Sequence, residues 1–316
     1  MNTSNLVASP LIRGESFTLS ALADTFMACY QGRDPIYGSR LAFFVEQLGH
    51  KAAAEIDADD IDDALDALRK RGKLFNRGGN KRGGKVVTTH QPLSDATINR
   101  YRCTIQSVLT WARRKRLMPK TWTNPVAETQ RLPENNARSR YLSETEYEKL
   151  LKVSRISSWP KLTLLIMLAV TTGARRGTLM GLQWKDVNLG EKRAFCARTK
   201  NGEPFVLVLM PDVLAEFERF TPKANPDDLV FCGSYPTKPM NFNKTWEIVL
   251  KEAGIDGVVF HTLRHTHASW LARRGAPLLA IADSLGHKSL AMTKRYAHLC
   301  VDSRAEMLNR IFHARE

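Results

Sequence analysis

The sequence predicts a mainly α-helical protein of two domains, with a small antiparallel β-sheet in the second. Three observations support this prediction. The 316 residues exceed what one hydrophobic core usually organises. Apolar residues recur at helical spacing over most of the chain. Finally, the pair Asn201-Gly202, a strong hairpin signal, lies between two segments rich in apolar and β-branched residues, 193–199 and 204–209.

The domain boundaries follow from changes in composition. Residues 131–140 are polar and contain Pro133 and three arginines, which is typical of an interdomain linker. The predicted division is a flexible tail at 1–14, a helical domain at 15–130, a linker at 131–140 and a second domain at 141–316.

The first domain opens with three predicted helices. The first is capped by Thr18 or Ser20, and the second carries apolar residues between Leu41 and Leu48. The third begins with acidic residues and ends in basic ones, a polarity that suits the helix dipole. Residues 69–90 then hold eight Lys or Arg, no acidic residue and five glycines. They predict a flexible basic loop, either a solvated surface loop or one that contacts phosphates.

A fourth helix, capped by Ser94, has an apolar face and a polar face, and it ends in the basic run 113–116. The polar face could lie on nucleic acid or simply face solvent. The candidate DNA contacts on this helix and in the linker are Arg100, Arg102, Arg113, Arg114, Arg138 and Arg140.

Helices also dominate the second domain. Ser143 with Glu146 predicts a capping box, a buried helix follows at about 161–172, and a short helix starts near 176. After the predicted hairpin, the chain is again mostly helical from residue 211.

Charge and patterning narrow the class of function. A net charge of +15 attracts polyanions, of which nucleic acid is the usual one. The sequence has no apolar run long enough to span a membrane and no pattern of a signal peptide, so a cytoplasmic location is expected. Five dispersed cysteines give neither a disulfide framework nor a zinc motif.

Six residues in four segments suggest a shared chemistry. They are two arginines, one lysine, two histidines and a tyrosine nine residues after the second histidine: Arg175, Arg264, Lys200, His261, His287 and Tyr296. The set includes no carboxylate, so it is unlike a two-metal nuclease and we expect no metal. Arginines bind phosphate oxygens, and a tyrosine can attack phosphorus if its surroundings activate it.

A zinc site is the competing interpretation of the histidines. His261 and His265 are four residues apart, and His267 is close by. A cation at Arg264 beside a metal is unfavourable, however, and the sequence has no Glu in the H-E-x-x-H pattern.

Taken together, residues 140–316 resemble the tyrosine recombinase (phage integrase) family. The resemblance rests on Arg175 after Thr172-Gly173, Lys200 in a hairpin, His261-Thr-Leu-Arg264, Leu285-Gly-His287 and the spaced Tyr296. It extends more weakly over 17–130, where the family has a helical core-binding domain. The resemblance implies a C-shaped clamp on double-stranded DNA.

By this resemblance, Tyr296 is the nucleophile and forms a 3′-phosphotyrosyl link without metal, ATP or other cofactor. Arg175 and Arg264 clamp the phosphate, and His261 hydrogen-bonds it and can take the Tyr296 proton. His287 stabilises the transition state, and Lys200 is the general acid.

The resemblance also implies a protein that is monomeric off DNA and tetrameric on two synapsed sites, and the apolar residues of 303–316 are expected to dock on a neighbouring protomer. With few residues before the first helix, an extra arm-binding domain is not expected. Thr178 stands where many relatives have an acidic residue that supports the site. A type IB topoisomerase-like enzyme and a non-catalytic DNA-binding protein are the alternative functions.

Overall fold

The chain forms two compact units, residues 1–137 and 138–316, each with its own hydrophobic core. The computed structural model describes residues 16–77, 85–89, 91–134, 140–196, 204–220, 225–300, 305, 308–309 and 311–312. The predicted tail at 1–14 and most of the tip of the basic loop lie outside these ranges.

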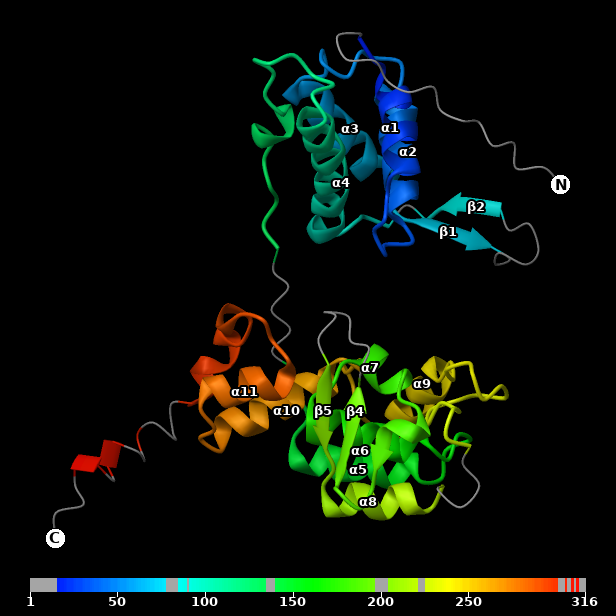
Figure 1. Ribbon diagram of the computed structural model, residues 1–316, viewed down its shortest axis with the longest axis vertical. Coiled ribbons are helices and arrows are strands. Elements are labelled where there is room, and N and C mark those ends of the chain that lie inside the picture. The colour runs from blue at the N-terminus through cyan, green and yellow to red at the C-terminus, as the bar shows by residue number, and fades with distance from the viewer. Residues whose placement is uncertain are drawn as a thin grey trace. The chain divides into compact units, whose positions relative to one another are not determined.

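Unit 1 is a four-helix arrangement with a β-ribbon at one end (Figure 1). Its elements are α1 (Leu19–Ala28), α2 (Tyr37–Leu48), α3 (Ala58–Arg71), β1 (Leu74–Arg77), β2 (Lys85–Thr88), α4 (Asp95–Arg114) and a 3₁₀ turn, η1 (Pro125–Ala127). The N-caps predicted from the sequence are present, since the Thr18 and Ser94 hydroxyls accept hydrogen bonds from the backbone N–H of Ala21 and Thr97.

The prediction of a flexible loop at 69–90 was wrong where the structure describes these residues. Helix α3 continues to Arg71, and β1 and β2 then pair antiparallel, with Phe75 opposite Val87. The short apolar segments on either side of the glycines supply this pairing. The Leu74 and Phe75 side chains are 49% and 55% exposed, so they are not part of a buried core. The many basic residues and glycines around them therefore dominated the sequence pattern, and the strands were not predicted.

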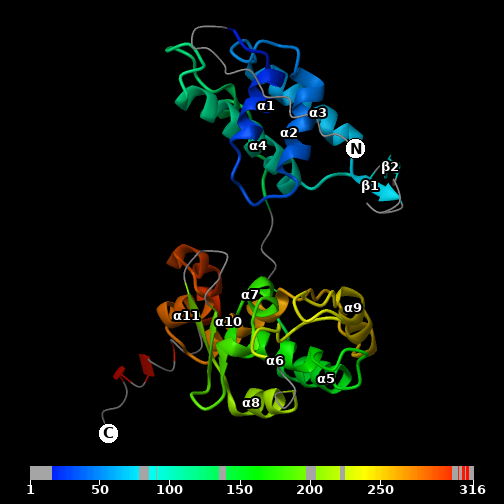
Figure 2. The same ribbon diagram turned by 45° about the vertical axis from the view of Figure 1, so that its right-hand side comes forward.

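Unit 2 combines helices with one small sheet. Its elements are α5 (Glu144–Ser154), α6 (Leu162–Thr172), α7 (Arg176–Met180), η2 (Trp184–Asp186), β3 (Val187–Asn188), β4 (Arg193–Cys196), β5 (Phe205–Val208), α8 (Pro211–Glu218), α9 (Asn243–Glu252), α10 (Thr262–Arg273), α11 (Leu278–Leu285), η4 (Leu290–Met292) and η5 (Lys294–Cys300). In both views α7 and α8 lie at opposite ends of this unit (Figure 2).

Helix α6 is the centre of unit 2. Nearly all its residues are buried, and it packs against α5, α8 and α10. A helix that is apolar all round must be surrounded by protein, and this one holds the ends of its neighbours in fixed positions. The predicted capping box of α5 is formed by Ser143 and Glu146.

The sheet has the order β3-β4-β5 and is antiparallel throughout. The predicted hairpin strands are present as β4 and β5, with Cys196 opposite Phe205. The turn between them, with Lys200, lies outside the described residues. Strand β3 is two residues long, too short to leave an alternating pattern in the sequence.

Within the ranges that the structure describes, no helix has both the length and the apolar character required to cross a bilayer.

Candidate active site

The turn between α6 and α7 places Arg175. Helix α6 ends at Gly173, whose φ of +63° lies in the left-handed region that favours glycine. A Cβ there would lie 2.6 Å from Cδ2 of His267, so glycine is also required by space. Arg175 is consequently the N-cap of α7, half-buried, and its guanidinium has no hydrogen bond among the described residues.

Arg264, in the first turn of α10, ties three segments together. Its Nη1 donates to the carbonyl oxygen of Gly173 and its Nη2 to that of Leu285, both at 2.7 Å. The side chain is buried, and burial with the nearby Arg175 lowers its pKa to about 10, so it stays charged at neutral pH. The end of α6, α10 and the end of α11 are therefore fixed around one buried cation.

His267 braces the same region from the other side of Gly173. Its Nδ1 lies 2.8 Å from the carbonyl oxygen of Val170 and therefore donates to it. Burial lowers the pKa of His267, so its Nε2 carries no proton and accepts from Ser284 Oγ at 2.6 Å. Both ring nitrogens are engaged, so His267 links α6 to α11 and is not available as a metal ligand.

His287 follows the end of α11, at a turn that begins with Gly286 in the left-handed region. Its Nδ1 lies 2.8 Å from Thr293 Oγ1. Burial and the positive charges of Arg264, Arg175 and Arg295 lower the pKa of His287 to about 4, so the ring is neutral at pH 7. A neutral imidazole in this cationic environment can hydrogen-bond an incoming anion.

Tyr296 lies in the 3₁₀ segment η5, packed on α10 and α11 with Ala268, Ile281 and Leu285. Its side chain is 6% exposed, and its hydroxyl oxygen lies 2.6 Å from Nδ1 of His265. Burial raises the pKa of Tyr296, and Arg295 and Arg264 oppose this effect. The tyrosine oxygen thus lies close to the buried cation.

The histidine bonded to this hydroxyl is His265, where the sequence had suggested His261. His261 precedes the first residue of α10, is exposed, and its ring packs edge-on against His265, with centroids 5.1 Å apart. His265 contacts both His261 and Tyr296. Sequence reasoning considered this residue only as a zinc ligand, and its place one helical turn after His261 does not by itself say which of the two meets the tyrosine.

The structure brings five of the six predicted residues to one region of unit 2, since the electrostatic influences above link Arg175, Arg264, His287 and Tyr296, and His265 links His261 to them. Lys200 lies outside the described residues. Thr178 is buried in α7, and its backbone N–H donates to the Arg175 carbonyl oxygen.

The three histidines do not form the alternative zinc site. His267 uses both ring nitrogens on Val170 and Ser284, and His265 uses Nδ1 on Tyr296. Among the residues that the structure describes, no group of three or more His, Cys, Asp or Glu is placed to hold a metal ion.

The predicted DNA contacts of α4 divide into two kinds. Arg102 binds within unit 1, because its guanidinium donates to Thr129 Oγ1 and to the carbonyl oxygens of Val126 and Thr129. Asn99 on the same face is 4% exposed and binds the backbone of Leu132. Residues 124–134 therefore pack on this face, and a DNA contact by Arg102, which stays a prediction, would have to compete with these bonds.

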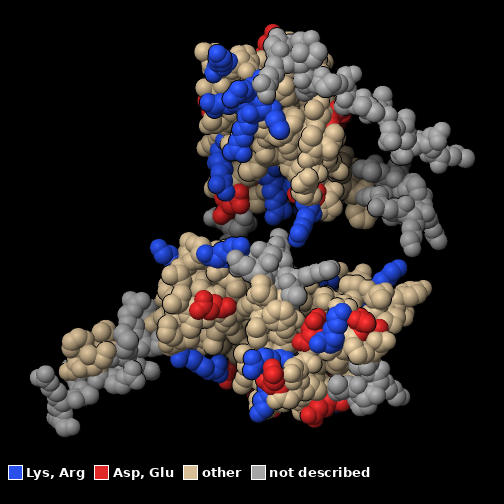
Figure 3. Space-filling model, in the orientation of Figure 1, with Lys and Arg blue, Asp and Glu red and all other residues tan. Residues whose placement is uncertain are grey.

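Arg100, Arg113 and Arg114 remain exposed on α4. Figure 3 shows Lys and Arg side chains gathered on the side of unit 1 formed by α4 and the segment after it. In unit 2, the same view shows both signs of charge interspersed.

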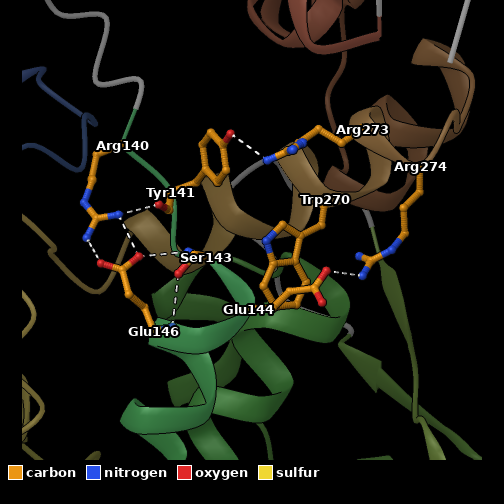
Figure 4. Close-up of a pocket in the computed structure, with 8 residues that line it drawn as sticks. All are labelled: Arg140, Tyr141, Ser143, Glu144, Glu146, Trp270, Arg273 and Arg274. Atoms are coloured by element: carbon orange, nitrogen blue, oxygen red, sulfur yellow. Dashed lines mark hydrogen bonds and ion pairs between the residues drawn. The ribbon is translucent and has the colours of Figure 1, made fainter. Parts of the chain in front are cut away.

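The two linker arginines have different outcomes. Arg138 lies outside the described residues. Arg140 is paired with Glu146, and it lines a pocket with Trp270 and Arg274 (Figure 4). The pair lowers the pKa of Glu146 to about 2. Arg140 thus fixes the start of α5, and contact with a phosphate would have to compete with this pair.

A buried tyrosine bonded to a histidine, beside a buried arginine and a neutral histidine, is an arrangement suited to phosphoryl transfer. The chain belongs to the phage integrase family, whose model matches residues 140–302. It is a tyrosine recombinase of that family. It is 25% identical over 299 residues to the integrase of Salmonella phage P22, covering 88% of this chain and 73% of that protein.

Other comparisons agree. The chain is 23% identical over 296 residues to the tyrosine recombinase XerA of Saccharolobus solfataricus, covering 94% of this chain and 92% of XerA. Among solved structures, the Tn1549 transposon integrase in complex with circular intermediate DNA matches with a TM-score of 0.68 and 19% identity. The match covers 92% of this chain and 99% of that chain. A lambda integrase dimer bound to a COC′ core site matches with a TM-score of 0.64 and 19% identity, covering 90% of this chain and 78% of that chain. These likenesses show the fold.

Proposed function

We propose that this recombinase cuts and rejoins double-stranded DNA at specific sites through Tyr296. The observation that carries the proposal is the placement of the Tyr296 hydroxyl, bonded to His265 and close enough to Arg264 for each to influence the pKa of the other. A nucleophile beside a buried cation is positioned to attack a phosphate that the cation attracts.

The first step forms a bond between the Tyr296 oxygen and phosphorus and breaks the bond from phosphorus to the 5′ oxygen. Arg175 has a free guanidinium among the described residues, and together with Arg264 it binds the non-bridging oxygens. Neutral His287 donates a hydrogen bond to the same phosphate through its free ring nitrogen. Lys200, assigned by family resemblance, protonates the departing 5′ oxygen.

The second step reverses the first with a different strand. The 5′-hydroxyl of the partner strand attacks the 3′-phosphotyrosyl link and gives its proton to the deprotonated Lys200, the bond to Tyr296 breaks, and the tyrosine recovers its proton. One phosphodiester replaces another, so the energy of the bond is conserved and neither ATP nor a metal is needed in the proposed reaction.

DNA is gripped by both units in this proposal, as in the clamp that the family resemblance implies. Arg100, Arg113 and Arg114 supply phosphate contacts from unit 1, supported by their exposure and by the basic face around them. A DNA substrate fits the cytoplasmic location predicted from the sequence.

Assembly is proposed to need four protomers on two synapsed sites, with monomers off DNA. The support is the exposed apolar surface of the C-terminal segment, where Leu308, Ile311 and Phe312 are 44, 60 and 71% exposed. Deleting residues 303–316 is expected to abolish cooperative assembly on DNA in sedimentation experiments. Normal tetramers from the shortened protein would contradict this part of the proposal.

Covalent selection tests the function. Wild-type protein is incubated with a library of randomised duplexes, each nicked so that the cleaved strand diffuses away, and the protein-linked DNA is sequenced. We expect recovery of one sequence family by the wild type, none by Tyr296→Phe, and retained binding of the selected duplex by the variant. Relaxation of supercoiled DNA without exchange between two selected sites would favour a topoisomerase-like enzyme, and binding without any adduct a non-catalytic protein.

A further inference from the structure

The geometry assigns a catalytic role to His265, which we infer accepts the proton of Tyr296 as its oxygen attacks phosphorus. This inference rests on the proposed function and names the base for its first step. It replaces the assignment of that proton to His261, which came from family resemblance.

The contact itself is the first argument. Nδ1 of His265 lies 2.6 Å from the Tyr296 oxygen, a distance at which a phenol donates to an unprotonated imidazole nitrogen. The bond joins residues 31 positions apart in the sequence and is therefore made by the packing of η5 on α10. His265 touches the reacting atom before any substrate arrives.

The position of His261 is the second argument. Its ring centroid is 5.1 Å from that of His265, and the His265 centroid is 6.1 Å from that of Tyr296. His265 thus contacts both of the other rings. His261 is exposed at the start of α10, where it can meet DNA, whereas His265 is half-buried beside the nucleophile.

The electrostatic setting is the third argument. A buried phenol gives up its proton reluctantly, and burial raises the pKa of Tyr296. Arg264 from α10 and Arg295 from η5 act in the opposite direction and favour the phenolate. His287, after α11, is kept neutral by burial and by Arg264, Arg175 and Arg295, so it adds no positive charge that would favour the phenolate. The net effect disfavours the tyrosinate, so forming it needs an adjacent proton acceptor.

The step balances in atoms and charge. The oxygen–phosphorus bond forms, the bond from phosphorus to the 5′ oxygen breaks, and the phenolic proton moves to Nδ1 of His265. A second proton reaches the departing 5′ oxygen from the general acid. In the rejoining step the attacking 5′-hydroxyl returns its proton to the general acid, and the proton on His265 returns to Tyr296.

The test compares His265→Asn with wild type on the nicked duplex obtained by covalent selection. The Asn side-chain oxygen replaces Nδ1 as hydrogen-bond acceptor but cannot take a proton. We expect the single-turnover rate of adduct formation to fall about 100-fold. We also expect the wild-type rate to rise with pH and this rise to disappear in His265→Asn. A rate within about threefold of wild type with the same pH profile would overturn the inference.

His261→Asn is the matched control, one helical turn away. If His261 is the base, this variant loses the pH-dependent rise and His265→Asn keeps it, which would also overturn the inference.

A duplex with sulfur as the 5′ bridging atom separates base from acid, because the sulfur leaving group needs no protonation. We expect this duplex to restore adduct formation by Lys200→Ala but not by His265→Asn. Restored adduct formation by His265→Asn would contradict the role of His265 as the base.

Folding is checked by thermal unfolding and by affinity for the same duplex. If His265→Asn does not fold, His265→Ala with added imidazole takes its place. Recovery of adduct formation by imidazole supports the inference, and a folded variant that imidazole does not restore contradicts it. If the wild type itself forms no adduct, it is the proposed function that fails.

Discussion

Helices α4 and α10 both carry an arginine whose guanidinium binds two backbone carbonyl oxygens, yet the two arginines have different consequences. Arg102 of α4 binds the carbonyl oxygens of Val126 and Thr129 and holds a neighbouring segment against its helix. Arg264 of α10 binds those of Gly173 and Leu285. Only the second pair of carbonyls belongs to turns that also carry reactive side chains, Arg175 and His287. The role of a buried arginine therefore depends on what lies beside the groups it binds.

The largest effect is expected from Arg264→Lys, which keeps the charge but loses the planar fork. Lysine cannot bind the Gly173 and Leu285 carbonyl oxygens in the same geometry. We expect adduct formation to fall by about 10²–10³-fold. The free energy of unfolding should drop by about 2–3 kcal/mol because a buried carbonyl loses its donor. Single-turnover kinetics and urea unfolding measure the two effects, and near-normal activity would remove the distinction between the two helices.

Gly173→Ala tests the turn that Arg264 grips. Positive φ and a Cβ placed 2.6 Å from His267 and 2.8 Å from Leu285 should together cost about 2–4 kcal/mol. Gly177→Ala, in α7 four residues on, is the control, because a Cβ there meets nothing within 4 Å. It should leave the free energy of unfolding within about 1 kcal/mol of wild type. If thermal unfolding shows that Gly173→Ala and Gly177→Ala lose the same stability, the turn at Gly173 is not specially constrained.

Arg102→Ala should lower the free energy of unfolding by about 1–3 kcal/mol, because the carbonyl oxygens of Val126 and Thr129 lose their donor. Its effect on adduct formation, measured per folded molecule, should be small. Arg100→Ala, an exposed neighbour on α4, should do the reverse. The free energy of unfolding of Arg100→Ala should stay within about 0.5 kcal/mol of wild type. The slope of log affinity for the duplex against log salt concentration should fall in magnitude by about one unit. If Arg102→Ala is as stable as wild type but binds DNA poorly, Arg102 is a DNA contact.

The smallest effect concerns acid pH and His287. The pKa of this histidine is about 4 in the folded protein, against about 6.5 in an unfolded chain. As pH falls below 6.5 the unfolded chain takes up the proton first, so stability is lost on acidification. At about pH 5 wild type should have lost on the order of 1–2 kcal/mol more than His287→Asn, relative to about pH 7.5. Parallel stability curves for the two proteins would show that His287 is not desolvated.

Much of the helical architecture could be predicted because helices leave a periodic pattern and start at recognisable caps. Ser143 and Glu146 formed their predicted box, and Gly173 ended α6 where expected. Strand β3 and the ribbon β1–β2 could not be predicted in this way. Two residues carry no alternation, and the apolar residues of the ribbon are embedded among glycines and basic residues that dominate the composition.

The candidate site could be predicted as a set of residue types, but not as a set of contacts. His261 and His265 lie one turn apart at the start of the same helix, and nothing in the sequence says which of them meets a tyrosine 31 residues beyond His265. Similarly, Asn99 and Arg102 have the spacing of an open polar face. The segment that covers them, 124–134, is polar itself and gave no sign of packing there.

The two carbonyl oxygens bound by Arg264 come from residues 91 positions before it and 21 positions after it. During synthesis on the ribosome, the first partner has long been made when Arg264 emerges, but the second has not. Tyr296 is made later still, after Leu285, and it reaches His265 only once η5 has packed on α10. Under the proposed function, a chain in which η5 has not yet packed on α10 has no means of breaking a DNA strand.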